Sequence, residues 1–267
     1  MNPECIQLGP WQLALAACLV GVNLLLSALL SLRLERQLLI ASCRMVAQLL
    51  FVGWILKWVF ALKNPVWVLS LGLIMTALAS QSAVGRTRRR FPRIFLSSFV
   101  SIMGAAFLVT LIAMTGIIKV EPWFEPQYFI PLLGMVLGNT MNGISLALDR
   151  FMEDTAQRQS RIESLLALGA GRWEAARESL REASRSGMIP IVNSMMVMGV
   201  VSLPGMMTGQ ILAGADPLDA VSYQIVIVFM IAAAAALGVM AVTLIAFFSL
   251  FNSRHQIRSD RLRRTRW

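Results

Sequence analysis

Residues 220–253 read AVSYQIVIVFMIAAAAALGVMAVTLIAFFSLFNS, and this stretch decides the fold class of the chain. It carries no charged side chain, and its apolar residues follow one another continuously instead of alternating with polar ones. A helix of about 20 apolar residues crosses a bilayer and satisfies its own backbone hydrogen bonds there, whereas the strands of membrane barrels alternate. The stretch therefore predicts a membrane-spanning helix and indicates an all-α membrane protein.

The rest of the chain repeats this pattern. Hydrophobic residues make up 57% of the 267 residues and charged residues only 14%, which excludes a soluble domain of this size and a disordered chain. The second apolar run lengthens to residue 60 if Lys57 extends to the membrane surface. The last two runs exceed a straight crossing, so we expect them to tilt, to extend beyond the lipid or to break. We predict seven spans, at residues 5–32, 45–56, 64–85, 94–118, 126–148, 186–215 and 220–253.

The arginines predict the orientation. The chain has 24 Lys and Arg against 14 Asp and Glu, a net charge of +10. The arginines cluster after the first, third, fifth and seventh runs, whereas Lys57, Lys63 and Lys119 lie at the opposite ends. Because cytoplasmic loops are enriched in Lys and Arg, we expect the amino terminus outside and the carboxyl terminus inside. We expect this charge to meet membrane lipids and no nucleic acid. The first run lacks a basic flank, so we do not expect it to be a cleaved signal peptide.

One long polar stretch, residues 149–187, interrupts the spans. Its apolar residues recur at helical spacing, and Gly169 and Gly171 divide it into two helices. One interpretation is a solvated hairpin that extends two spans into the cytosol, which suits the charges. The other is a short cytoplasmic helix that presents a face to a partner, which explains why Leu165, Leu166 and Leu168 lie beside a glycine turn. The residues alone leave both interpretations open.

The sequence also limits the energy source. A P-loop needs a lysine before Ser or Thr, and the three lysines precede Trp58, Asn64 and Val120. The spans carry no deeply placed ionisable group that would couple transport to protons, and the single histidine, His255, lies in the tail. We therefore expect no cofactor and no enzyme activity in this chain. A transporter of this kind would depend on ATP and Mg²⁺ bound by a separate ATPase.

Two spans carry polar or helix-breaking residues at membrane depth. In the fifth run, Asn139 and Asn142 are three residues apart and share one helix face. In the sixth run, Pro204 removes a backbone hydrogen bond and Gly205 loosens the helix, which predicts a break. Broken helices occur at membrane depth where they line a cavity and free carbonyls for ligands. The candidate residues of a substrate pathway are Asn139, Asn142, Asn193, Ser202, Pro204, Gly205, Met206, Met207 and Gln210.

Methionines are frequent in the sixth run. Their thioethers are soft ligands that suit Cu(I), but adaptable packing around a kinked helix accounts for them as well. The sequence forms no complete ligand set, so a metal site stays unknown at this stage. These methionines are Met188, Met195, Met196, Met198, Met206 and Met207.

Residues 199–229, GVVSLPGMMTGQILAGADPLDAVSYQIVIVF, resemble the FetB-type permease family of ABC transporters. Bacterial members of that family are associated with iron export, and they are similar to plant permeases linked to aluminium tolerance. The resemblance covers nearly the whole chain. It implies a permease that forms a homodimer and is driven by a separate cytosolic ABC ATPase. Its specific core is Leu203-Pro204-Gly205-Met206-Met207 with Gly209, Pro217 and Tyr223-Gln224.

The polar stretch carries a second resemblance. In the coupling loop of ABC importers, a Glu-Ala-Ala motif precedes a glycine, and Glu163 stands at the matching distance before Gly169. Ser164 and Leu165 replace the two alanines. The resemblance implies a helix that couples the permease to its ATPase, with contact residues Glu163, Leu165, Leu166 and Gly169.

We therefore predict one transmembrane permease domain over residues 1–267, with a coupling loop at 149–187 and a basic cytoplasmic tail at 252–267. Its predicted function is export of a metal ion, iron by the resemblance, across the inner membrane. A membrane scaffold that anchors a cytosolic partner is an alternative, and it would tolerate leucine in place of the pathway amides. An ATP-independent carrier is another, and it would not co-purify with an ATPase.

Overall fold

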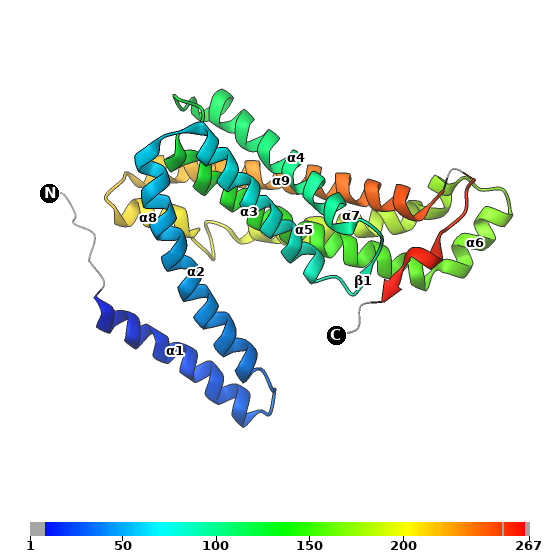
Figure 1. Cartoon of the computed structure of the whole chain (residues 1–267), viewed down its shortest axis with the longest axis horizontal. Coiled ribbons are helices and arrows are strands. Elements are labelled where there is room, and N and C mark those ends of the chain that lie inside the picture. Colours follow the sequence, from blue (N-terminus) through cyan, green and yellow to red (C-terminus); the bar gives the residue numbers. More distant parts are fainter. Residues whose placement is uncertain (1–8, 253, 265–267) are drawn as a thin grey trace.

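The computed structural model describes residues 9–252 and 254–264, and most of them are helical, which confirms the all-α class (Figure 1). A π-helical segment, η1 (Ala113–Ile118), extends α4, and a 3₁₀ turn, η2 (Ser259–Arg261), follows α9. Two short strands, β1 (Arg89–Arg90) and β2 (Arg263–Arg264), pair antiparallel. The α-helices are α1 (Pro10–Leu29), α2 (Glu35–Leu62), α3 (Pro65–Gly85), α4 (Ile94–Ile112), α5 (Pro126–Gln157), α6 (Gln159–Ala167), α7 (Arg172–Val197), α8 (Gly205–Leu212) and α9 (Pro217–Leu250).

Six helices of the described chain are long and apolar enough to cross a membrane: α1, α2, α3, α4 with η1, α5 and α9. Two of them are longer than the charge-free runs that predicted them. Helix α2 already begins at Glu35, upstream of residue 45, and α5 continues to Gln157, beyond residue 148. Charges mark where a helix leaves the lipid, but the backbone hydrogen bonds continue past that point, so charge-based boundaries were too short.

The sixth predicted span, residues 186–215, is not one helix. Its first part belongs to the end of α7, its last part forms α8, and residues 198–204 between them are not helical. This division explains why the segment is absent from the six long apolar helices. Of the seven predicted spans, six are therefore long apolar helices, and the sixth, for which a break was predicted, is a divided segment.

Helices α3, α5 and α9 begin in the same way, with proline in the first helical turn. Pro65, Pro126 and Pro217 occupy this position, where the missing N–H costs no helical hydrogen bond. The side chain of Asn64 accepts a hydrogen bond from the N–H of Val66 at 2.9 Å, and Asp216 caps α9 in the same manner. These local signals fix where α3, α5 and α9 start.

Helix α5 lies at the centre of the bundle and packs against α3, α4, α7 and α9. Gly143 of α5 and Gly187 of α7 allow the backbones of these two helices to approach each other closely. A Cβ atom on Gly187 would lie 2.8 Å from the carbonyl oxygen of Gly143, a distance that Cβ atoms do not adopt. On α9, a Cβ atom on Gly238 would likewise lie too close to the side chain of Thr140, at 2.7 Å. These glycines hold α5, α7 and α9 together as one packed unit.

Helices α1 and α2 form a hairpin that extends away from this bundle (Figure 1). Only 6% of the most apolar window of each helix is buried. The hydroxyl of Ser27 joins the two helices, since it donates to Glu35 at 2.9 Å and accepts from the N–H of Leu34 at 3.1 Å. The apolar surface of the hairpin is therefore open to lipid or to another copy of the chain.

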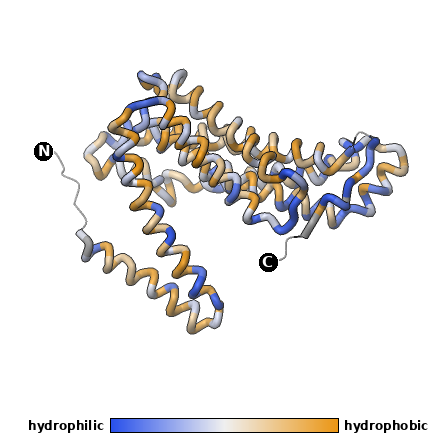
Figure 2. Tube along the Cα trace, in the orientation of Figure 1, coloured by the Kyte–Doolittle hydropathy of each residue, from blue (hydrophilic) through white to orange (hydrophobic). Residues whose placement is uncertain are grey.

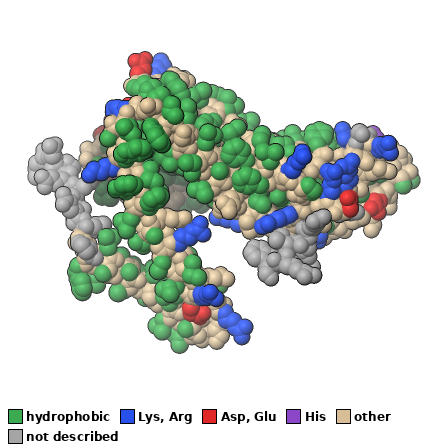
Figure 3. Space-filling view, in the orientation of Figure 1, with side chains coloured by type: hydrophobic (Ala, Val, Ile, Leu, Met, Phe, Trp, Pro, Cys, Tyr) green, Lys and Arg blue, Asp and Glu red, His purple; other side chains and the backbone are tan. Residues whose placement is uncertain are grey.

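Polar residues gather toward the end of the molecule that carries α6, while the spans are mostly hydrophobic (Figure 2). On the visible face, Lys and Arg side chains lie at this end, and others lie on the α1–α2 hairpin (Figure 3). The strands β1 and β2 lie at this end, and they place Arg89 opposite Arg264 and Arg90 opposite Arg263. The predicted basic tail thus folds back, in its described part, onto the loop between α3 and α4.

Candidate substrate pathway and coupling surface

The break between α7 and α8 has identifiable local causes. The carbonyl oxygen of Val197 accepts hydrogen bonds in a turn, and Gly199 takes a φ of +83°, which glycine adopts without strain. The N–H of Gly199 donates to the carbonyl oxygen of Ser202 at 2.9 Å. Pro204 is extended and precedes Gly205, the exposed first residue of α8. The interruption expected at Pro204 and Gly205 is present, and it is longer because the chain already turns at Gly199.

A cavity of about 450 Å³ lies beside the break. Pro204 and Met207 line it together with Met195 and Met198, so three of the predicted run's methionines border one space. Gln224 of α9 lines it too, is 7% exposed, and has an Oε1 atom without a hydrogen-bond partner in the described part of the chain. Buried amide oxygens normally have partners, so this atom is available to a ligand or a water.

A second cavity, of about 360 Å³, lies on another side of α8. Met206 and Gln210 of α8 line it, with Met135 of α5 and the phenol rings of Tyr128 and Tyr223. Within residues 9–252 and 254–264, the Oε1 atom of Gln210 also lacks a hydrogen-bond partner. Helix α8 therefore presents predicted pathway residues to two cavities, each with an unpaired amide oxygen and with thioethers.

The predicted asparagines lie elsewhere. Asn139 and Asn142 are exposed on α5, and neither lines either cavity. The Nδ2 atom of Asn139 donates to a carbonyl oxygen of its own helix, and the Oδ1 atom of Asn142 accepts from Arg86 at 2.6 Å. Asn193 of α7 and Ser202 of the break are exposed as well. The structure thus brings the proline, methionine and glutamine candidates together and leaves these four on the surface of a single chain.

The cavities are also lined by polar residues that were missing from the predicted pathway, among them Gln224, Tyr223 and Tyr128. Gln224 and Tyr223 give a sequence signal, because they are polar groups within the charge-free run 220–253. Tyr128 gives none, since a tyrosine near the start of a span is common at membrane surfaces. In the described residues, no three His, Cys, Asp or Glu side chains gather in a way that could hold a metal ion.

The second candidate surface is the hairpin formed by residues 149–187, which comprises the end of α5, α6 and the start of α7 (Figure 1). Gly169 closes α6 with a φ of +92°, and its N–H donates to Leu166 at 3.1 Å. Leu165 and Leu166 are partly buried against the core, whereas Leu168 is 85% exposed. Glu163 is exposed and accepts a hydrogen bond from the helix's own Gln159. The apolar tip is therefore Leu168, one of the three leucines beside the glycine turn but not one of the four predicted contact residues.

A charged network braces this hairpin. The Nε atom of Arg158 lies 3.1 Å from Asp154, and its Nη1 atom lies 2.7 Å from Glu178 of α7. Asp154 is buried and accepts a hydrogen bond from Ser179 at 2.7 Å. The hydrogen bond from Arg158 lowers the pKa of Glu178 below its ordinary value of 4.5. The network joins the end of α5 to α7 at the base of α6.

Arg172, the first residue of α7, ties the hairpin to the end of α9. Its N–H donates to the Nδ1 atom of His255 at 2.9 Å, and its Nη1 atom donates to the carbonyl oxygen of Asn252 at 3.1 Å. Its guanidinium carbon also lies 5.3 Å from the ring centroid of Phe248. The hairpin is thus attached to α5, α7 and α9 and is not an independent loop.

One known protein family matches almost the whole chain. The pattern described as "Uncharacterised protein family (UPF0014)" matches residues 10–251, from the start of α1 to just past α9. The chain belongs to the UPF0014 family. The FetB-type resemblance is confirmed, because FetB is among the relatives of this chain.

Relatives are similar over almost their whole length. The UPF0014 membrane protein slr1647 of Synechocystis sp. is 42% identical, over 90% of this chain and 92% of its own. The "Probable iron export permease protein FetB" of Escherichia coli is 34% identical, over 92% of this chain and 93% of its own. The "Protein ALUMINUM SENSITIVE 3" of Arabidopsis thaliana is 31% identical, over 91% of this chain and 89% of its own. No solved structure is significantly similar.

Proposed function

We propose that the chain is the permease subunit of an ABC transporter that exports a metal ion across the inner (plasma) membrane. The observation that carries this proposal is the braced hairpin, because it presents an exposed leucine tip at the end of the molecule where basic residues gather. A rigid projection of this kind can transmit the movement of a docked ATPase to the spans. The relative named as an iron export permease supports iron as the metal and export as the direction.

The proposal includes seven crossings, with the amino terminus outside. Arg172 at the start of α7 contacts Asn252 beyond the end of α9, which supports one common side for these two ends. Helix α8 shares a cavity with Tyr128 and Tyr223, near the starts of α5 and α9, which supports the opposite side for α8. The chain from α7 through the break to α8 would then make the remaining crossing. The arginine distribution favours the cytosol for the α6 end.

Coupling would proceed through the hairpin. ATP and Mg²⁺ would be bound by the partner ATPase, which contacts α6 at Glu163, Leu168 and Gly169, and this chain would carry no nucleotide site of its own. Closure of the ATPase would move α6, and the Arg158 network would pass that movement to α5 and α7. The far end of α7 leads directly into the break beside the cavities, so the same movement would change access to them.

The two cavities and the exposed amides form the proposed pathway. Gln210 and Gln224 offer unpaired oxygens, and the methionines offer thioethers, to an ion that passes α8. Asn139, Asn142 and Asn193 would meet a second copy of the chain, because polar side chains that face lipid are unfavourable. A homodimer would thus place both sets of side chains along one route.

The test uses the full chain, tagged and purified from its own cells, and membrane vesicles of inside-out orientation. We expect ATP-hydrolysing activity to co-purify, and ATP to drive uptake of iron into the vesicles, with copper and manganese measured in parallel. Leu168→Asp should reduce both co-purified ATP hydrolysis and uptake, because a charge at an apolar contact is unfavourable. Leu34→Asp, an exposed leucine outside the hairpin, is the matched control and should change neither.

Three results would oppose the proposal. Full ATPase association and uptake in Leu168→Asp would favour a merely solvated hairpin. Association with an ATPase but no transport of any of the three metals would favour a scaffold, and metal uptake without ATP would favour a carrier.

A further inference from the structure

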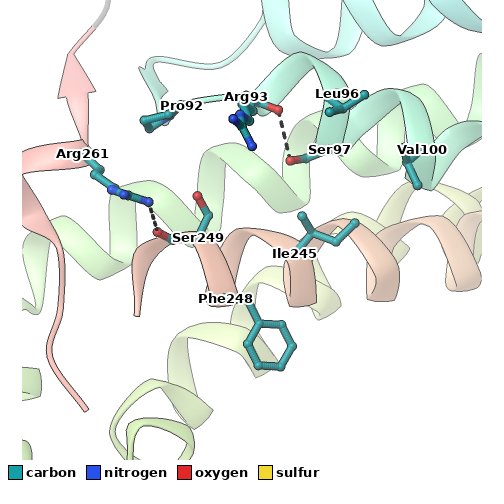
Figure 4. A pocket seen from close by; sticks show the side chains of 9 residues that line it. All are labelled: Pro92, Arg93, Leu96, Ser97, Val100, Ile245, Phe248, Ser249 and Arg261. Atoms are coloured by element: carbon teal, nitrogen blue, oxygen red, sulfur yellow. Dashed lines mark hydrogen bonds between the residues drawn. The ribbon is translucent and has the colours of Figure 1, made fainter. Parts of the chain in front are cut away.

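An open cavity of about 680 Å³ lies between the start of α4 and the end of α9, away from α8 (Figure 4). Arg93 immediately precedes α4, and Arg261 belongs to η2. Both side chains line the cavity, at the same end of the bundle (Figure 4). Ser97 and Ser249 supply hydroxyl groups between them. The pathway does not use this cavity, and the coupling hairpin meets its lining at Phe248, which Arg172 contacts.

The charged end of the cavity has no acidic partner among the described residues. Within residues 9–252 and 254–264, no carboxylate lies within salt-bridge distance of Arg93 or Arg261. Arg261 donates from Nη1 to the carbonyl oxygen of Ser249 at 3.3 Å, and a guanidinium has five N–H donors, so most remain available. Helix α4 begins at Ile94, so the positive end of its dipole adds to the same region.

The remaining wall of the cavity is apolar. Leu96 and Val100 lie one helical turn apart on α4, and Ile245 and Phe248 lie one turn apart on α9. Leu96, Val100 and Phe248 are exposed in the chain by itself. The cavity therefore has two guanidinium groups at its end and a hydrophobic groove that follows two spans. A ligand that fits both parts has an anionic head and a hydrocarbon chain.

We propose that this cavity binds an anionic phospholipid, with its phosphate between Arg93 and Arg261 and one acyl chain along Leu96, Val100 and Phe248. Paired arginines suit phosphate oxygens, and basic pockets between spans on the cytoplasmic side suit anionic headgroups. The lipid would join α4, α9 and the folded-back tail.

The experiment measures lipid binding by the thermal unfolding of the purified full chain in neutral detergent. Phosphatidylglycerol should raise the unfolding temperature in a saturable way, and phosphatidylcholine with the same acyl chains should not. The double variant Arg93→Gln with Arg261→Gln should bind phosphatidylglycerol about tenfold more weakly or worse, because two charge-assisted contacts are lost. Arg150→Gln, which removes an exposed arginine of α5 outside the cavity, is the matched control and should bind normally.

Two further arms separate the lipid from a free phosphate. Inorganic phosphate should not reproduce the shift, since it lacks the chain that fills the groove. Val100→Trp fills the apolar wall without changing charge, and it should weaken phosphatidylglycerol binding. Unchanged lipid binding in the double arginine variant, equal stabilisation by phosphatidylcholine, or full stabilisation by inorganic phosphate would each overturn the proposal. None of these readouts depends on transport or on an ATPase.

Discussion

Asp154 connects the fold to the proposed coupling at the level of a single residue. Its carboxylate is 4% exposed, and it binds Ser179 through one oxygen and Arg158 through the other. A buried carboxylate is unfavourable unless it is paired in this way. The residue therefore stabilises the base of the hairpin only while both partners remain in place.

Replacing Asp154 by alanine should reduce stability by about 1–3 kcal/mol, because Ser179 loses its acceptor and Arg158 loses one of two carboxylates. Asp154→Asn, which keeps an oxygen for Ser179, should lose less. Thermal unfolding in detergent measures the effect, and the same samples should show weaker stimulation of the ATPase. Equal stability of both variants and the original chain would show that the network does not brace the hairpin.

Glu178 makes part of this brace depend on pH. Its pKa is lower in the folded protein than its ordinary value of 4.5, because Arg158 donates a hydrogen bond to the carboxylate. Its contribution to stability is therefore complete above pH 4.5 and is lost as the pH falls through the lower, folded value. The difference in unfolding temperature between the original chain and Glu178→Gln should be constant near neutral pH and shrink in acid. A difference that grows in acid would have the wrong sign.

At the level of elements, the break between α7 and α8 depends on two glycines with different roles. Gly199 has a φ of +83°, whereas Gly205 has ordinary helical surroundings and open space where a Cβ would stand. Only Gly199 therefore needs the conformational freedom of glycine. Because the turn at Gly199 lies outside Pro204 and Gly205, replacing those two alone is not expected to straighten the whole segment.

Gly199→Ala should cost about 1–2 kcal/mol of stability, since L-residues disfavour the left-handed region, and it should slow metal transport if the break gates the pathway. Gly205→Ala is its matched control and should be neutral or slightly stabilising. Thermal unfolding and vesicle uptake of both variants give the comparison. If Gly199→Ala transports normally despite its lower stability, the break is a packing feature and the pathway assignment fails.

Much of this architecture follows from local sequence. Charge-free runs located α3, α4 with η1 and α9. The adjacent Pro204 and Gly205 predicted an interruption in the sixth run. The ends of α2 and α5 did not follow, because a helix is held by backbone bonds that charged residues do not interrupt. The sequence also did not show that the break begins with a turn at Gly199, since a glycine within a span can equally allow close packing of helices.

The candidate sites were less predictable than the spans. The spacing of Asn139 and Asn142 placed both on one face of α5, but spacing does not say whether that face meets lipid, protein or a second copy, because lipid and protein interior are both apolar. Gln224 faces a cavity only because α9 packs beside α8. Leu168 became the tip of the hairpin because Gly169 reverses the chain immediately after it.

For the whole molecule, the arrangement of helices makes a clear prediction of sidedness. The loop between η1 and α5 and the loop between α3 and α4 lie at opposite ends of α4 with η1. If the arginine-rich end is cytoplasmic, these loops face opposite compartments. The exposed positions Glu121 and Arg90 report on them.

In a variant without native cysteines, Glu121→Cys should react with a membrane-impermeant thiol reagent added to intact cells, and Arg90→Cys should react only after the membrane is opened. Both variants should label fully in detergent, which controls for accessibility. The opposite pattern would reverse the proposed orientation, and labelling of both positions in intact cells would show that these loops share one side.

The pairing of β1 with β2 also has a consequence for biosynthesis. Residues 89–90 leave the ribosome early, but their partners at 263–264 follow only after α9 has been made. Contacts so distant in sequence form late, because the intervening chain must first be placed. During translation the loop after α3 therefore remains an unpaired basic segment while the later helices are made. The segment beyond α9 can pair with that loop only after it has been made. The last stage of assembly therefore connects the loop after α3 to the segment after α9.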